Sequence, residues 1–206
     1  MKRSRFADKH GLYAVTPDGL DGAVLLKSVA EALAGGASWV QYRAKSRADA
    51  GTAAAIAGLC RRHHAVFIVN DDPELAAGVD ADGVHLGRDD DSIAGARALL
   101  GADRIIGVSC YNNLERAAVL AAQGADYLAF GSMYPSPTKT DAVRCSPEVL
   151  TEARGLGKPV AAIGGITLDK APELVAAGAD LLAVISDLFD APDIKARAAA
   201  YSRLFG

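Results

Sequence analysis

Residues Val66–Asp91 read VFIVNDDPELAAGVDADGVHLGRDDD, and the rest of the chain can be interpreted from this segment. Its two apolar runs, VFIV and GVHLG, each end at a cluster of oxygen-bearing side chains. A short run of β-branched and aromatic residues that stops at acids is typical of a buried strand ending in a functional loop. The stretch therefore predicts two successive strands, joined by a short helix, whose acidic ends lie side by side.

Similar apolar runs recur along the chain, with Ala-rich amphipathic segments between them. The runs are nearly continuous in apolar character rather than alternating, as expected for a parallel sheet covered on both faces. Asp72 and Ser146 each precede a proline, as a helix N-cap does, and Asn112 has capping-box spacing with Glu115. The eight runs expected as strands are Gly11–Thr16, Trp39–Arg43, Val66–Asn70, Gly83–Gly87, Arg104–Cys110, Tyr127–Gly131, Val160–Gly165 and Leu181–Asp187.

A weak internal repeat supports this alternation. Four helix-to-strand junctions read GGASW, GVDADG, QGADY and AGADL, and their aligned positions are Ser38, Asp82, Asp126 and Asp180. Each glycine fits the left-handed residue that ends a helix, and the short polar residue opens the next strand. A repeat of two βα units that occurs four times gives eight units. This favours an α/β fold over residues 1–206, a single-domain (β/α)8 TIM barrel. An open doubly wound sheet is the competitor, but no glycine fingerprint follows the first strand.

Composition excludes several function classes. The 206 residues carry 22 Lys and Arg against 25 Asp and Glu, so the net charge is −3. A nucleic-acid or membrane-surface binder would show a basic excess, and no run reaches the ~18 apolar residues of a transmembrane helix. No apolar stretch of signal-peptide length follows the basic start, so residues 1–10 are expected to be a poorly ordered N-terminal segment. Three widely separated cysteines indicate reduced thiols in a cytoplasmic protein. The sequence leaves open whether the chain forms a homo-oligomer.

The candidate site follows from the barrel, whose active site lies at the C-terminal ends of the strands. Asn70 and Asp71 at the third strand, and one of Asp89, Asp90 or Asp91 after the fourth, are expected to bind a hard divalent cation such as Mg²⁺. His85 has the parity to point into the barrel. A packed, hydrogen-bonded histidine and a catalytic one fit this position equally.

Cationic side chains beside these acids indicate an anion. Gln41, Arg43 and Lys45 share parity at the end of the second strand, so they face the mouth together. A polyanion held by Arg, Lys and a metal would explain both charge types, and a structural ion pair between the strands is the alternative. Ser109 ends the fifth strand, where its hydroxyl can bind phosphate or substrate.

Two further segments extend this anion site. The longest stretch without a regular pattern, GSMYPSPTKTDAVRCSP, follows the sixth strand and supplies Ser136, Thr138 and Lys139. The seventh strand ends at Gly164-Gly165 and the eighth at Ile185-Ser186, where such barrels usually form a phosphate cup. One position suits a diphosphate and the other a monophosphate, which suggests that two substrates are joined with loss of diphosphate.

The motifs QYRAK, VNDD, DGVHLGRDD, GVSC, PSPTKT, AIGGIT and VIS resemble those of the thiamine-phosphate synthase family in order and spacing, over nearly the whole chain. That family joins a hydroxymethylpyrimidine diphosphate to a thiazole phosphate, giving thiamine phosphate and diphosphate. The resemblance implies that Gln41 holds the pyrimidine with His85 nearby, and that Asp71 and Asp90 hold Mg²⁺. It implies diphosphate contacts for Arg43, Lys45, Asn70, Ser109 and Lys139. It implies thiazole-phosphate contacts for Gly164, Ile185 and Ser186, with Ser136 and Thr138 close by.

The expected mechanism is a dissociative displacement. Lys139, Arg43, Lys45 and Ser109 are the expected catalytic residues, because they would stabilise the departing diphosphate together with Mg²⁺. Ser136 and Pro137 depart from a more usual threonine-rich loop. Two alternatives are a thiazole tautomerase-like or other phosphate-binding barrel isomerase, which leaves the cations unused, and a non-catalytic barrel that binds a thiamine metabolite.

Overall fold

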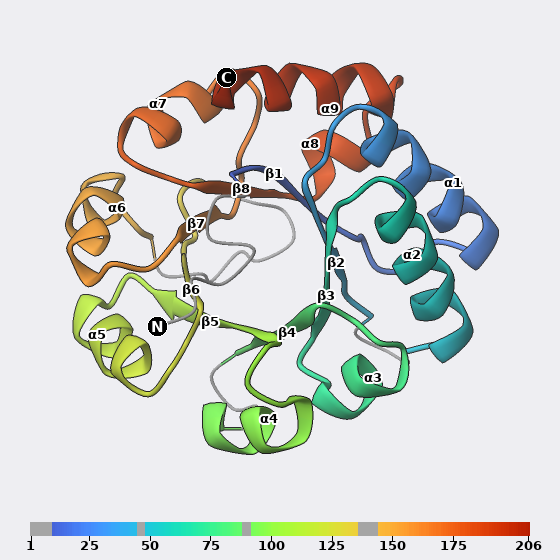
Figure 1. Ribbon diagram of the computed structural model, residues 1–206. Coiled ribbons are helices and arrows are strands. Elements are labelled where there is room, and N and C mark those ends of the chain that lie inside the picture. The colour runs from blue at the N-terminus through green and yellow to red at the C-terminus, as the bar shows by residue number, and fades with distance from the viewer. Residues whose placement is uncertain (1–9, 45–47, 88–91, 136–143) are drawn as a thin grey trace.

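The computed structural model describes residues 10–44, 48–87, 92–135 and 144–206. Within these ranges eight parallel strands close into a barrel in sequence order, and helices surround it (Figure 1), so the TIM barrel is confirmed. Of the expected N-terminal segment 1–10, only His10 is among the described residues. The strands are β1 Gly11–Val15, β2 Trp39–Tyr42, β3 Val66–Asn70, β4 Gly83–Leu86, β5 Ile105–Tyr111, β6 Tyr127–Phe130, β7 Val160–Ile163 and β8 Leu181–Val184.

Helices follow the strands around the outside of the barrel. The last long helix packs beside the first, where the ring closes (Figure 1). The helices are α1 Gly22–Ala34, α2 Ala50–Arg62, α3 Pro73–Gly78, α4 Ile93–Leu100, α5 Leu114–Ala122, α6 Glu148–Ala153, α7 Ala171–Ala176, α8 Ser186–Phe189 and α9 Ile194–Ser202, with 3-10 turns η1 Arg154–Leu156 and η2 Arg203–Phe205.

The predicted helix starts are confirmed in one case and shifted in two. Asp72 caps α3, because its carboxylate accepts the Leu75 amide at 2.7 Å. The N-cap of α5 is Asn113, one residue after the predicted Asn112. The N-cap position of α6 is Pro147, without a side-chain cap, so the prediction for Ser146 is wrong.

The apolar residues form two cores because strand side chains alternate between the two faces of the barrel wall. The larger core lies between the wall and the helices. The smaller one fills the barrel, where the rings of Tyr13, Trp39 and Tyr127 meet with centroids 5.5–6.0 Å apart. Gly107 is required beside them, since a Cβ there would lie 2.0 Å from the Tyr127 ring. The interior is therefore packed rather than hollow at this level.

The residues of the internal repeat join neighbouring strands at the N-terminal end of the barrel. Asp126 shows the arrangement: its amide donates to the Ile106 carbonyl at 2.7 Å, and its carboxylate accepts the Ile106 amide at 2.8 Å. Asp82 makes the same two-way contact with Phe67, and Asp180 makes it with Val160. The repeat therefore marks a recurring bridge between strands.

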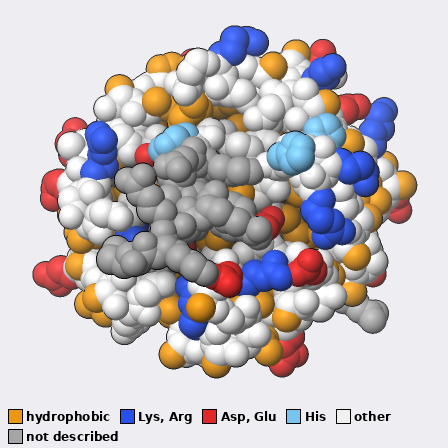
Figure 2. All heavy atoms as spheres, viewed as in Figure 1, with side chains coloured by type: hydrophobic (Ala, Val, Ile, Leu, Met, Phe, Trp, Pro, Cys, Tyr) orange, Lys and Arg blue, Asp and Glu red, His pale blue; other side chains and the backbone are white. Residues whose placement is uncertain are grey.

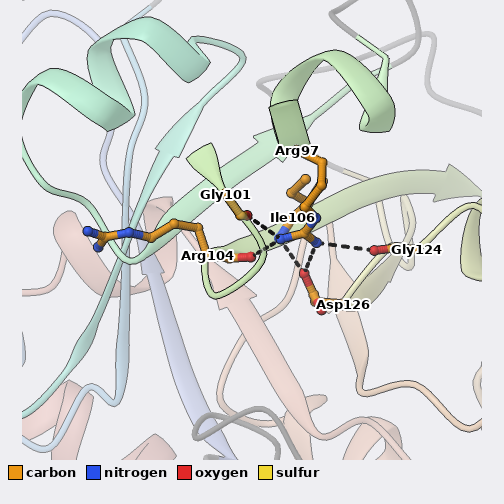
Figure 3. A network of polar contacts seen from close by, with 6 residues as sticks. All are labelled: Arg97, Gly101, Arg104, Ile106, Gly124 and Asp126. Carbon is orange, nitrogen blue, oxygen red and sulfur yellow. Dashed lines mark hydrogen bonds and ion pairs between the residues drawn. The ribbon is translucent and has the colours of Figure 1, made fainter. Parts of the chain in front are cut away.

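Arg97 of α4 extends the bridge at Asp126. Its guanidinium contacts the Asp126 carboxylate at 2.7 Å, and it also donates to the carbonyls of Gly101, Arg104 and Gly124 (Figure 3). One arginine thereby ties a helix to the loops before β5 and β6.

The glycines of the repeat are left-handed in three of the four junctions. Gly36, Gly124 and Gly178 have φ between 98° and 106°. In the second junction Gly78 lies inside α3, and Asp80 takes the left-handed position with φ 56°. The expectation for that glycine is wrong, because aspartate is among the residues that tolerate this conformation.

The charges on the surface are mixed. On the face drawn in Figure 2, the described basic and acidic side chains are interspersed around the rim and form no patch of one sign. No helix among the described residues is long and apolar enough to cross a membrane.

Candidate active site

A continuous chain of hydrogen bonds crosses the barrel interior from β2 to β5. The Gln41 amide nitrogen donates to the Tyr13 hydroxyl at 2.8 Å, and that hydroxyl lies 2.9 Å from the hydroxyl of Tyr127. Tyr127 contacts Nδ1 of His85 at 2.8 Å, and Nε2 of His85 contacts the Ser109 hydroxyl at 2.9 Å. The inward parity predicted for His85 is confirmed, and the chain brings three predicted residues together: Gln41, His85 and Ser109.

The two tyrosines of this chain keep their protons. Burial raises the pKa of Tyr13 well above its ordinary value, against the lowering effect of its hydrogen bonds to Tyr127 and Gln41. Burial also raises the pKa of Tyr127, and the neighbouring Tyr13 adds to the shift. Both side chains are therefore neutral hydroxyl groups, each with one proton to donate.

The end of β3 presents Asn70 and Asp71 together. Asp71 adopts a left-handed backbone conformation with φ 61°, and its amide donates to the His85 carbonyl at 2.8 Å, which fixes the turn beside β4. Its carboxylate is exposed and accepts from the Asn70 amide at 2.5 Å. This carboxylate and the Asn70 carbonyl are hard oxygen donors, so the residue types fit a Mg²⁺ site.

Arg43 contacts an acid that the sequence analysis did not single out. Its guanidinium pairs with Asp18 at 2.7 Å, and its side chain is only 15% exposed. Its main chain is clasped by buried Thr16, whose hydroxyl accepts the Arg43 amide at 2.9 Å and donates to the Arg43 carbonyl at 3.2 Å. Arg43 is thus in an ion pair, but not in the one weighed as an alternative, because its partner follows β1 rather than β3 or β4.

Arg116 of α5 supports the ends of two strands from outside the barrel. Its guanidinium donates to the carbonyl of Ser109 at 3.0 Å and to that of Gly87 at 3.3 Å. The main chain at Ser109 is therefore held from behind, while its side chain faces His85.

The residues predicted to form a phosphate cup lie at the ends of β7 and β8. Gly164 and Gly165 are left-handed, and a Cβ at Gly164 would lie 2.2 Å from the Ser132 hydroxyl oxygen, so glycine is required for this close approach. The eighth strand ends at Val184, three residues before the predicted end at Asp187. Ile185 precedes α8, and Ser186 begins it.

Several predicted residues lie outside the described part of the chain. They are Lys45, the acids Asp89, Asp90 and Asp91, and the loop residues Ser136, Pro137, Thr138 and Lys139. In the described residues no group of three or more His, Cys, Asp or Glu side chains could hold a metal.

Tyr13, Tyr127, Asp18 and Arg116 are the site residues that sequence reasoning missed. The tyrosines sit in apolar runs that read as strand core. Parity compares side chains only within one strand, so it could not place them beside His85 and Gln41. Asp18 and Arg116 belong to no strand-end motif, so the sequence carried no signal for them.

Comparisons with known proteins agree with this architecture. A family model described as thiamine monophosphate synthase matches residues 12–188. A thiamine-phosphate synthase of Aromatoleum aromaticum is 54% identical over 199 residues, covering 95% of this chain and 96% of that protein. One of Methylobacillus flagellatus is 51% identical over 208 residues, covering all of both.

Solved structures were compared with the chain as well, and both of the following share its fold. A thiamine phosphate pyrophosphorylase of Pyrococcus furiosus superposes with a TM-score of 0.86 at 35% identity, covering 98% of each chain. A 3-hexulose-6-phosphate synthase superposes with a TM-score of 0.70 at 16% identity, covering 94% of this chain and 99% of that one, and this likeness shows the shared fold alone.

Proposed function

Because the chain belongs to the thiamine monophosphate synthase family, we propose that it joins a pyrimidine diphosphate to a thiazole phosphate by a Mg²⁺-assisted dissociative displacement. It is an enzyme, a transferase that forms thiamine phosphate. The observation that carries the proposal is the meeting of Gln41, His85 and Ser109 in one hydrogen-bonded chain beside the Asn70–Asp71 turn. That grouping offers hydrogen bonds for a heterocycle next to oxygen donors for a metal.

The residues divide by the part of the substrates that they would contact. Gln41 and His85 would hold the pyrimidine. The diphosphate would be bound by Arg43, Lys45, Asn70, Ser109 and Lys139. The phosphate of the thiazole would lie against Gly164, Ile185 and Ser186, with Ser136 and Thr138 nearby.

Asp71 and Asp90 would hold Mg²⁺, which takes one or two carboxylates and fills its remaining positions with water and phosphate oxygens. When bound, the metal neutralises charge on the diphosphate. The chain itself would supply positioning and fixed positive charge where the leaving group develops negative charge. An electron-rich aminopyrimidine can carry the resulting cation, so little protein acid–base chemistry is needed.

The direct test mixes both substrates with Mg²⁺ and measures thiamine phosphate and diphosphate together. We expect equal amounts of the two products and no reaction when EDTA removes the metal. Asp71→Ala and Lys139→Ala are each expected to lower kcat by ~10²-fold or more, because each removes charge stabilisation of the leaving group. Near-normal turnover in either variant, with Mg²⁺ present and the barrel folded, would contradict the assignment of that residue.

The experiment also separates the two alternatives. Retained activity in EDTA on a single phosphorylated substrate would favour an isomerase. Tight product binding without diphosphate release would favour a non-catalytic binding protein.

We further propose a cytoplasmic location. The free state of Cys60, Cys110 and Cys145, all of them buried, supports it.

A further inference from the structure

We propose that the hydrogen bonds linking Gln41, Tyr13, Tyr127, His85 and Ser109 all run in one direction, each residue donating to the next. This polarity links the orientation of the Gln41 amide to the tautomer of His85. It also makes Ser109 a hydrogen-bond donor toward the mouth of the barrel. This proposal rests on the proposed function for the anion that Ser109 meets. It assigns Tyr13 and Tyr127 as positioning residues, which act through Gln41, His85 and Ser109.

The polarity follows from counting protons along the chain. The Gln41 amide nitrogen can only donate, so the Tyr13 oxygen accepts from it at 2.8 Å. Tyr13 then has one proton left, and its neighbour in the chain is the Tyr127 hydroxyl at 2.9 Å. Tyr127 accepts that proton and turns its own toward Nδ1 of His85 at 2.8 Å. Raised pKa values keep both hydroxyls protonated, so neither can act as an acceptor only.

His85 and Ser109 complete the sequence of donors. Because Nδ1 accepts from Tyr127, a neutral imidazole carries its proton on Nε2 and donates it to the Ser109 hydroxyl oxygen at 2.9 Å. Ser109 then keeps its own proton for another acceptor. Arg116 holds the carbonyl of Ser109 at 3.0 Å, so only the hydroxyl of this residue remains to be oriented.

The reverse polarity requires a different amide orientation at Gln41. If Ser109 donated to His85, each following proton would turn the other way and Tyr13 would point its proton at Gln41. Only the carbonyl oxygen of that amide could accept it. A chain of mixed polarity would leave either a buried hydroxyl proton without an acceptor in this chain or the two tyrosine oxygens 2.9 Å apart with no proton between them. Leaving a buried polar group unsatisfied costs ~1–3 kcal/mol.

Two consequences reach the ligands. The two protons on the Gln41 amide nitrogen are directed to Tyr13 and Tyr127. Gln41 therefore offers its carbonyl oxygen to a ligand N–H, which favours an amino-substituted heterocycle over one with an acceptor at that position. At the other end, Ser109 donates to an anion rather than accepting from it.

The tautomer of His85 can be read directly by ¹⁵N NMR on the whole, substrate-free protein. The chain contains four histidines, so the His85 signals are assigned by their loss in His85→Asn. We expect the neutral tautomer with its proton on Nε2. A proton on Nδ1, or a doubly protonated ring at neutral pH, would overturn the proposal.

Gln41→Glu provides a sharper test because it forces the reverse polarity. A carboxylate can only accept, so Tyr13 must donate to it, Tyr127 must donate to Tyr13, and His85 must carry its proton on Nδ1. Because burial raises carboxyl pKa values, the tautomer is read at a pH where the ¹³C shift of the new side chain shows it ionised. A ring that keeps its Nε2 proton under that condition would also overturn the proposal. The wild-type measurement decides the matter if this variant does not fold.

Kinetics test the positioning role. Tyr127→Phe is expected to lower kcat about tenfold, with KM for the thiazole phosphate changed less than about twofold, because Ser109 loses its fixed orientation. Adding Ser109→Ala to Tyr127→Phe should cost much less than Ser109→Ala alone, whereas independent structural effects would add.

The matched control is Tyr201→Phe, which removes another buried hydroxyl. Its partner is Asp187, which takes no part in the hydrogen bonds from Gln41 to Ser109. We expect its kcat to stay within about twofold of wild type. Equal losses in Tyr127→Phe and Tyr201→Phe, or additive effects of Tyr127→Phe and Ser109→Ala, would count against the proposal. A wild-type protein that makes no thiamine phosphate but shows the Nε2 tautomer would refute the proposed function and leave the chain polarity intact.

Discussion

Asp18 is the residue whose role is most open to measurement, because its carboxylate occupies the guanidinium of Arg43 at 2.7 Å. If Arg43 binds diphosphate, Asp18 competes with that ligand for the same donors. We expect Asp18→Asn to tighten the binding of Mg²⁺-diphosphate two- to about fivefold, since a partly exposed ion pair contributes ~0.2–1 kcal/mol. Isothermal titration calorimetry measures the change.

A matched control for Asp18→Asn is Asp80→Asn, which changes the charge equally and removes the ion pair with Arg104 at the other end of the barrel. Asparagine tolerates the left-handed backbone of Asp80. Diphosphate affinity should stay close to wild type in this control. Weaker binding in Asp18→Asn than in Asp80→Asn would mean that Asp18 positions Arg43 rather than competes for it.

At the residue scale, sequence reasoning singled out Gln41 and His85 by their parity and Ser109 by its place at a strand end. The structure joins the three side chains in one hydrogen-bonded chain, and their roles stay predictions. The same reasoning did not find every member of that chain. It failed for Tyr13 and Tyr127, because a tyrosine in an apolar run looks the same whether its hydroxyl reaches solvent or a buried partner. Asp18 was missed because an ion pair between separate loops leaves no periodic signal.

At the element scale, the bridges at the N-terminal end of the barrel should contribute stability rather than activity. Asp126→Ala would leave the buried Ile106 amide and the Arg97 guanidinium without their shared carboxylate. We expect the free energy of unfolding to fall by ~1–3 kcal/mol, as measured by urea denaturation. The folded variant should keep kcat within about twofold, because the site lies at the opposite ends of the strands.

Asp126→Asn is the informative companion to Asp126→Ala. Its amide oxygen can still accept the Ile106 amide, so it should lose less stability than the alanine variant. Equal losses of unfolding free energy in the two variants would assign the effect to the ion pair between Asp126 and Arg97 instead of the hydrogen-bonded bridge between strands.

The elements themselves were predictable because hydrophobic patterning and the repeat both reflect the whole barrel. All eight expected runs contain a strand, within the described residues. The ends of the elements were harder to place. The expected eighth strand ran through Ser186, which in the structure begins α8. The boundary was missed because the apolar run of β8 continues into α8, and apolar residues fit either element. The prediction that Ser146 caps α6 failed because the helix begins one residue later than expected, at Glu148. Pro147 therefore takes the N-cap position, and its side chain makes no capping hydrogen bond.

At the scale of the whole molecule, buried acids that stay protonated should make the fold sensitive to alkali. Burial raises the pKa of Cys60 and of Cys110 to about 12, and it also raises the pKa values of Tyr13 and Tyr127. In the unfolded chain thiols ionise near ~8.5 and phenols near ~10. As pH rises, the unfolded chain therefore loses these protons first.

The stability that these groups contribute is fully present below their unfolded pKa values and is lost as pH rises toward the folded ones. We expect the free energy of unfolding to fall from about pH 9 upward. The slope should be up to ~1.4 kcal/mol per pH unit for each group that is ionised only in the unfolded chain. Urea denaturation between pH 7.5 and 11, followed by circular dichroism, measures this slope.

Replacing Tyr13 and Tyr127 together by Phe removes two of the titrating groups, so the variant should show a shallower slope above pH 10 even if it is less stable at pH 8. An unfolding free energy that is the same at pH 8 and pH 10.5, or a slope unchanged in the double variant, would show that these buried protons do not control the alkaline limit of the fold.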